Sequence, residues 1–172
     1  MFLIKNLSAR WGKMVSPAIV YAHCDIPCGI YDPHTAQIAA LTTVRMNQLI
    51  EALETPGASA SAKEKSDYAH AISRYTSVKE EHSEQCKSEL RILWADYFKP
   101  EHVEEYPELH EKVFNALKAA SKVRQTQDLN ASKDLLCATQ DIAEIFWKTK
   151  GSIPVKHSSR QGAVGEELVY PS

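Results

Sequence analysis

The sequence predicts an all-α protein, an antiparallel up-down-up-down four-helix bundle that follows an N-terminal segment of different character. Four segments carry apolar residues at the spacing of an α-helix, and short loops separate them. The segments between them lack the alternation of apolar and polar residues that is typical of a half-buried strand. The length of 172 residues and the hydrophobic fraction of 44% fit one globular domain.

The first helix is expected over residues 33–54. Asp32-Pro33 is a helix-start signal, because Asp accepts hydrogen bonds from first-turn amides and Pro at the first helical position loses no needed donor. Thr55-Pro56-Gly57 ends this helix, and residues 58–62 form a linker of small residues. The second helix is the longest and continues until Lys99-Pro100 stops it.

The third helix is expected to begin around Pro107 and to be followed by a loop over residues 121–130. Asn130 then caps a fourth helix over residues 131–150, which completes a bundle spanning 33–150. After Gly151 the chain is rich in Gly, Ser and charged residues and shows no helical period. Residues 151–172 are therefore expected to form a flexible tail.

The composition excludes two classes of protein. No stretch approaches the roughly 20 consecutive apolar residues that a membrane-spanning helix needs, so no membrane span is expected. The formal net charge of −2 and the pI of about 6.4 provide no global basic field, so no nucleic-acid partner is expected.

The first 22 residues contain three basic side chains but no acid, since the first carboxylate of the chain is Asp25. This asymmetry predicts a cleavable leader over residues 1–22. A secretory signal, an organelle transit peptide and a leader that only masks residue 23 all remain open at this point. Removal of the leader changes the formal net charge from −2 to −5.

The residues directly after the predicted leader carry the ligands for a metal. If the chain is cut before His23, the freed α-amine, the amide nitrogen and thiolate of Cys24, and the thiolate of Cys28 form a nearly planar set of two nitrogens and two sulfurs. Pro27 and Gly29 allow the turn that brings Cys28 back to the metal. The imidazole of His23 can add an axial ligand. Planar or tetragonal geometry favours Ni(II) or Cu(II), whereas Zn(II) prefers a tetrahedron.

The segment HCDIPCGIYDP, residues 23–33, resembles the nickel hook of nickel-containing superoxide dismutases. Two further segments support the resemblance, LWADYFKPEHVEEYPELH at 93–110 and IFWKTK at 145–150, and together the similarity covers about residues 23–150. It implies a superoxide dismutase with one nickel ion per subunit that alternates between Ni(III) and Ni(II) and produces oxygen and hydrogen peroxide. It also implies a homohexamer, a processing peptidase that exposes His23, and a cytoplasmic location, although targeting to an organelle by the leader remains open.

The resemblance also implies a role for each residue of the hook, the segment 23–31. His23 provides the amine and the axial imidazole, Cys24 the amide and one thiolate, and Cys28 the second thiolate. Asp25 braces the hook, and Tyr31 lies over the open axial face, where its hydroxyl can hold a small anion or water. Asp96 and Tyr97 then belong to a supporting wall around the hook.

Two positions depart from the family pattern. Well-known members place an acid on the first helix and an Arg on the second to orient the axial imidazole, whereas an ungapped comparison places Ala39 and His82 there. Partners of this kind set the orientation and basicity of a metal ligand. We therefore expect the redox tuning of the metal to differ more than the reaction.

Other interpretations of the same residues remain. A nickel carrier or sensor could use the hook without turnover, and superoxide turnover would distinguish it from an enzyme. A structural oligomer with a decayed site is a further alternative, although His23, Cys24 and Cys28 are all intact. A ferritin-like di-iron site needs Glu-x-x-His on two helices, and no Glu is followed by His three residues later.

Two further expectations concern cysteines and substrate access. Cys86 and Cys137 fall inside predicted helices and are expected to be buried as small apolar residues. A protein with a net charge of −5 repels superoxide overall, so we hypothesise that Lys99 focuses a positive field near the hook.

Overall fold

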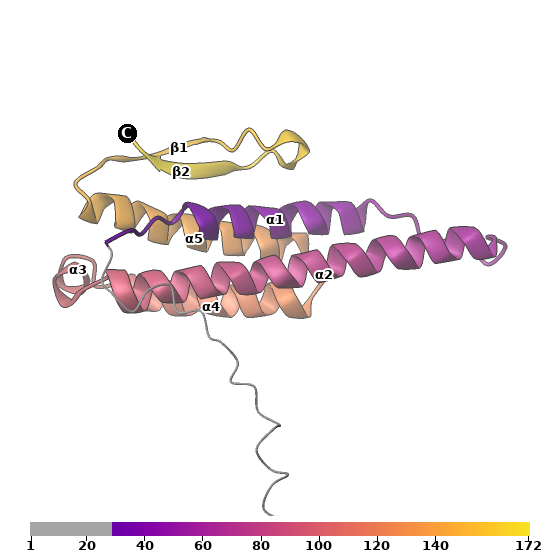
Figure 1. Cartoon of the computed structure of the whole chain (residues 1–172), viewed down its shortest axis with the longest axis horizontal. Coiled ribbons are helices and arrows are strands. Elements are labelled where there is room, and N and C mark those ends of the chain that lie inside the picture. Colours follow the sequence, from indigo (N-terminus) through magenta and orange to yellow (C-terminus); the bar gives the residue numbers. More distant parts are fainter. Residues whose placement is uncertain (1–28) are drawn as a thin grey trace, which may run out of the picture.

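The computed structural model describes residues 29–172. Four long helices form a bundle: α1 (His34–Glu51), α2 (Ala62–Ile92), α4 (Leu109–Gln125) and α5 (Leu129–Thr149). Figure 1 shows α1 beside α5 in one layer and α2 with α4 in a second layer, with successive long helices running in opposite directions. This arrangement confirms the predicted helical bundle.

The first two helices begin close to where the sequence places them. α1 follows Pro33 directly, and the amide of His34 donates to the Asp32 side chain at 2.6 Å. α2 starts with a capping box, in which Ser61 and Glu64 satisfy each other's backbone amides, with distances of 3.2 Å and 2.7 Å. Each end thus satisfies amides that a helix leaves without partners.

The core lies between the two layers and is made mostly of small and aliphatic side chains. Small residues of α1 and α4, such as Ala36, Ala40 and Ala116, are fully buried and allow close approach of the helices. Large side chains of the other helices, including Leu90, Leu135 and Phe146, fill the remaining space. Burial of such side chains stabilises the fold by roughly 1.5–3 kcal/mol each.

The second helix stops before Lys99-Pro100 as predicted, since its helical run ends at Tyr97, and Phe98 and Lys99 have extended backbone. Pro100 then begins a short helix that the sequence did not predict, α3 (Pro100–Glu105). α4 continues to Gln125, five residues into the predicted loop, since Val123 extends its buried stripe. α5 begins earlier than expected, because Asp128 rather than Asn130 is its cap and accepts from the amides of Asn130 and Ala131.

The prediction of a flexible tail over residues 151–172 is wrong. These residues form a β-hairpin of β1 (Pro154–Ser158) and β2 (Glu167–Pro171), which pair antiparallel with Lys156 opposite Val169. Figure 1 shows the hairpin lying across the layer of α1 and α5. Val164, Leu168 and Val169 are buried there, with exposed fractions of 5%, 0% and 1%. This burial supplies the apolar contact that a disordered segment lacks.

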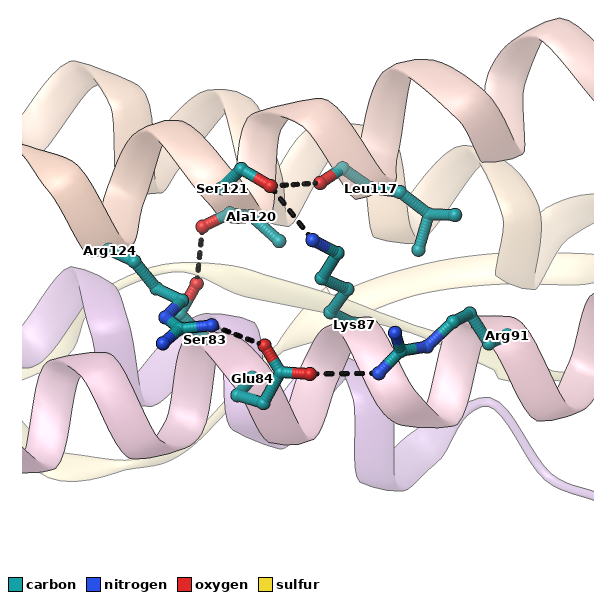
Figure 2. Close-up of polar contacts among 8 residues, drawn as sticks. All are labelled: Ser83, Glu84, Lys87, Arg91, Leu117, Ala120, Ser121 and Arg124. Carbon is teal, nitrogen blue, oxygen red and sulfur yellow. Dashed lines mark hydrogen bonds and ion pairs between the residues drawn. The ribbon is translucent and has the colours of Figure 1, made fainter.

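Polar side chains join α2 to α4 within the second layer, as Figure 2 shows. The hydroxyl of Ser83 donates to the Ala120 carbonyl at 2.6 Å, and Lys87 donates to Ser121 at 2.9 Å. The Glu84 carboxylate accepts from Arg91 at 2.8 Å and from Arg124 at 2.6 Å. The contacts of Ser83, Lys87 and Arg124 hold α2 beside α4, whereas the Glu84–Arg91 pair lies within α2. Asp96 and Tyr97 of the candidate site follow α2 in the chain.

None of the helices within residues 29–172 is long and apolar enough to cross a bilayer.

Candidate metal centre and its pocket

A pocket of about 380 Å³ lies at the end of the bundle where α1 begins and where α2 and α5 end. The antiparallel order of the helices brings these three ends together. The pocket is lined by residues before α1, by the turn after α2, by α3 and by the end of α5, namely Gly29, Tyr31, Asp96, Tyr97, Lys99, His102, Thr149 and Lys150. Two residues at the end of the predicted hook, Gly29 and Tyr31, therefore line this pocket.

Tyr97 is the central side chain of the pocket wall. It lies in a π-helical turn, Leu93–Tyr97, in which the Phe98 amide reaches back to the Leu93 carbonyl at 3.0 Å. Such turns are frequent at functional sites because they re-aim the side chains of a helix. The turn places the Tyr97 ring against the ring of Tyr31, with a centroid distance of 5.5 Å and an angle of 51° between the planes.

Several contacts hold the Tyr97 ring in place. Its hydroxyl lies 2.7 Å from the hydroxyl of Thr149, which itself donates to the Phe146 carbonyl at 2.7 Å. The ring packs on Phe146 with a centroid distance of 4.5 Å and stacks on His102 at 5.6 Å. With only 9% of its surface exposed, Tyr97 is a rigid support for Tyr31.

The pocket carries more positive than negative charge at neutral pH. The ammonium group of Lys150 lies over the Tyr97 ring, 4.8 Å from its centroid, and Lys99 lies at the pocket edge with its ammonium 4.0 Å from Glu101. Asp96 is the acidic residue among the lining side chains. Two ammonium groups and one carboxylate thus line the pocket, and the Glu101 carboxylate beside Lys99 offsets part of the positive charge.

His102 has a fixed orientation in the pocket wall. Its Nδ1 accepts a hydrogen bond from the Lys99 amide at 3.2 Å, so the ring carries its proton on Nε2 when it is neutral. The same bond anchors the first turn of α3 beside the π-helical turn.

The structure tests only part of the predicted site. His23, Cys24, Asp25 and Cys28 lie outside the described residues. Tyr31 is brought together with Asp96, Tyr97 and Lys99, all of which the sequence had singled out.

Three residues of the pocket were not predicted from the sequence, His102, Thr149 and Lys150. Thr149 and Lys150 belong to the segment IFWKTK that carries part of the family resemblance. The segment was therefore a usable signal for their position, although not for their roles.

The two positions that depart from the family pattern carry no acid–base pair. Ala39 is buried in the core with 1% of its surface exposed and offers no polar group. His82 donates from Nδ1 to the Val78 carbonyl of its own helix at 2.9 Å. The positions of Ala39 and His82 thus supply no carboxylate–guanidinium pair to orient an imidazole.

The cysteines of the described helices do not form a second metal site. Cys86 is buried as predicted, and burial raises the pKa of its thiol to about 12. Cys137 is exposed, so the prediction that it is buried is wrong, because it lies on the outer face of α5. Within residues 29–172 no group of three His, Cys, Asp or Glu side chains converges on a point where a metal could bind.

The family model for nickel-containing superoxide dismutase matches residues 18–150. The chain belongs to the nickel-containing superoxide dismutase family. The chain is 37% identical over 139 residues to "Superoxide dismutase [Ni]" of Streptomyces coelicolor (strain ATCC BAA-471 / A3(2) / M145), covering 80% of this chain and 96% of that protein. It is 38% identical over 139 residues to the protein of the same name from Streptomyces seoulensis, with the same coverage.

Solved structures of nickel superoxide dismutase share the fold. A native structure has a TM-score of 0.64 and 37% sequence identity, and the match covers 74% of this chain and 99% of the chain in that structure. A second structure, with nickel ligation corresponding to the oxidized state, has a TM-score of 0.65 and 38% identity over 76% of this chain and 100% of its own.

Family membership establishes the class of reaction and the metal. The chain is an oxidoreductase that acts on superoxide, and its cofactor is nickel. The interpretation as a non-catalytic nickel carrier or sensor is not favoured, because both relatives are named as dismutases. The donor set predicted at His23, Cys24 and Cys28 fits nickel chemically, since a planar set of thiolates and nitrogen donors would match the geometry that Ni(II) prefers.

Proposed function

We propose that the nickel ion of this dismutase is held by a hook formed by residues 23–31, after cleavage of residues 1–22. In this proposal His23 provides its α-amine and an axial imidazole, Cys24 an amide nitrogen and a thiolate, and Cys28 a second thiolate. The observation that carries the proposal is the pocket around Tyr31, because Gly29 lies one residue after the last ligand and lines that pocket.

Bound nickel supplies a one-electron couple, Ni(III)/Ni(II), that can oxidise one superoxide to oxygen and reduce another with two protons to hydrogen peroxide. The residues of the chain act on the substrate and on the protons. Lys99 and Lys150 draw the anion into the pocket. The Tyr31 hydroxyl, aligned by the packing of its ring on Tyr97, holds the anion or a water molecule and provides a proton donor. Asp25 braces the hook.

The rings of the pocket wall support Tyr31 in this role. Tyr31, Tyr97 and His102 form a continuous set of rings, in which each neighbouring pair has a centroid distance of 5.5–5.6 Å. These contacts limit the positions that the Tyr31 hydroxyl can take in the pocket.

Maturation, assembly and location belong to the same proposal. A peptidase removes residues 1–22, which creates the His23 amine that the metal requires. The processed chain, residues 23–150 with its hairpin, assembles as a homohexamer and works in the cytoplasm, where thiols stay reduced. The family resemblance of the hook motif supports these points.

Substitution of single cysteines tests the proposed ligand set. The chain is produced with His23 as its first residue, loaded with Ni(II), and compared with Cys24→Ser, Cys28→Ser and the matched control Cys137→Ser, which changes an exposed helical thiol. We expect both hook variants to lose stoichiometric nickel and dismutase activity, and the control to keep both. Retention of activity by either hook variant would contradict the ligand set.

A further inference from the structure

The C-terminal hairpin lies outside the part of the chain that the family model matches, which ends at residue 150. It rests on α1 and α5, yet it lines none of the pocket at the hook. The hairpin can therefore affect the pocket only through the helices to which it is attached.

Glutamine side chains attach the hairpin to the bundle. Three amides donate to hairpin carbonyls, Gln37 to Val169 at 3.0 Å, Gln48 to Val164 at 3.1 Å and Gln140 to Glu167 at 2.8 Å. Gln37 makes a second bond, since its side-chain oxygen accepts from the Val169 amide at 2.7 Å. The fully buried side chain of Gln37 thus forms hydrogen bonds with both the amide and the carbonyl of Val169 in β2.

Gln37 lies in the first turn of α1, where one side chain, Asp32, caps the helix by accepting from the His34 amide at 2.6 Å. Pro33 is the N-cap residue and makes no side-chain capping bond, and no acidic residue falls in the first turn. The hairpin holds this turn through two contacts. Gln37 bonds to Val169, and the ring of Tyr170 lies 5.7 Å from the ring of His34.

Residues 31–34 connect the first turn of α1 to the pocket. Tyr31 is three residues before His34, and three residues span at most about 10 Å. Pro33 further limits the connection, because its ring fixes one backbone angle and restricts the preceding residue. A shift of the first turn of α1 therefore moves Tyr31 relative to Tyr97.

We propose that the C-terminal hairpin is a brace that positions Tyr31 in the pocket by fixing the first turn of α1 through Gln37. In this view Gln37 is a positioning residue and touches neither metal nor substrate. The proposal rests on the proposed function in one respect, the role of Tyr31 beside the metal.

Amide hydrogen exchange in the metal-free protein tests the brace. Gln37→Met keeps the shape of the side chain and removes both bonds to Val169. Gln48→Met is the matched control, because it removes one bond to the same hairpin from the same helix, about 16 Å further along the axis. We expect Gln37→Met to accelerate exchange over residues 30–40 by about tenfold or more, and Gln48→Met to leave those amides within about twofold of the parent.

The second-order rate of dismutation by the nickel-loaded chain that begins at His23 gives a second measurement. We expect Gln37→Met to lower this rate several-fold relative to Gln48→Met, because a displaced Tyr31 no longer holds the anion. Unchanged exchange over residues 30–40 in Gln37→Met would overturn the brace, and so would faster exchange with a rate equal to that of Gln48→Met. Failure of the parent chain itself to bind Ni(II) would instead contradict the proposed ligands, and the exchange measurement would still decide whether the hairpin fixes Tyr31.

Discussion

The most informative single perturbation is the replacement of Tyr97, because the structure separates the role of its ring from that of its hydroxyl. The ring contacts Tyr31, Phe146 and His102, whereas the hydroxyl meets only Thr149 among the hydrogen-bond partners described. Tyr97→Phe therefore removes the hydroxyl contact alone. Tyr97→Leu removes the support on which Tyr31 rests.

The expected magnitudes follow from these contacts. Tyr97→Phe removes one neutral hydrogen bond, and Thr149 keeps its bond to the Phe146 carbonyl, so the free energy of unfolding should fall by about 1 kcal/mol. Tyr97→Leu removes most of a buried aromatic side chain and several ring contacts, so the expected loss is about 3 kcal/mol. Activity should follow the ring, with Tyr97→Phe close to the parent and Tyr97→Leu at least about tenfold slower.

Urea unfolding and the second-order rate of dismutation measure the two effects. The control is Thr149→Val, which removes the same hydroxyl contact from the other side and leaves the Tyr97 ring in place. If the ring positions Tyr31, Tyr97→Phe and Thr149→Val behave alike and Tyr97→Leu stands apart in rate. Equal rates for Tyr97→Phe and Tyr97→Leu would refute this reasoning.

Three further predictions concern the hairpin, the buried thiol and the pocket charges. Leu168→Ala should lower the free energy of unfolding by about 2–5 kcal/mol in a urea titration, since the Leu168 side chain of β2 is fully buried in the core. The Cys86 thiol, with a pKa raised by burial to about 12, should resist a thiol reagent at pH 9 that modifies Cys137. The folded protein retains the Cys86 proton at pH values where the unfolded chain has lost it. The contribution of the Cys86 thiol to the free energy of unfolding should therefore decline from about pH 9 toward pH 12, and Cys86→Ala should abolish this decline. Lys99→Ala and Lys150→Ala should each lower the rate and weaken its dependence on ionic strength.

Each of these predictions has a clear contrary result. A Leu168→Ala protein as stable as its parent would mean that the hairpin does not cover the bundle. Equal labelling of Cys86 and Cys137 in the folded protein would contradict the burial of Cys86. Salt dependence of the rate identical to that of the parent in both lysine variants would remove the pocket charges from the account.

The helices were predictable because their signals are local. Asp32-Pro33 predicts the start of α1, and the helical spacing of apolar residues predicts all four long helices. The differences lie at helix ends. Pro100 follows the end of one helical run and begins α3, because Pro is compatible with the first position of a helix, and the Lys99 amide donates to His102 three residues later.

The hairpin was not predictable from its own composition. Its strands are short, and only Leu168 and Val169 are deeply buried in β2. Much of its attachment comes from glutamine side chains on α1 and α5, residues that a helical pattern assigns to solvent. The full burial of Gln37 is explained by a partner 132 positions away in the sequence, and such a contact leaves no local signal.

The site was predictable in its metal chemistry and less so in its surroundings. The ligand types and their spacing in residues 23–28 point to nickel without any fold. His102 and Lys150 enter the pocket because the end of α2, α3 and the end of α5 converge, which depends on the topology of the bundle. Cys137 was predicted to be buried because cysteine is a small apolar residue, but it lies on the exposed face of α5.

The central claim, that a metal-binding amine created by cleavage makes this chain a dismutase, is tested most directly by one comparison. The second-order rate of superoxide loss is measured by pulse radiolysis for the nickel-loaded chain before and after engineered cleavage that leaves His23 as the first residue. The account predicts catalytic turnover only after the cut. Equal turnover by the uncut chain, or nickel bound without turnover after the cut, would contradict it.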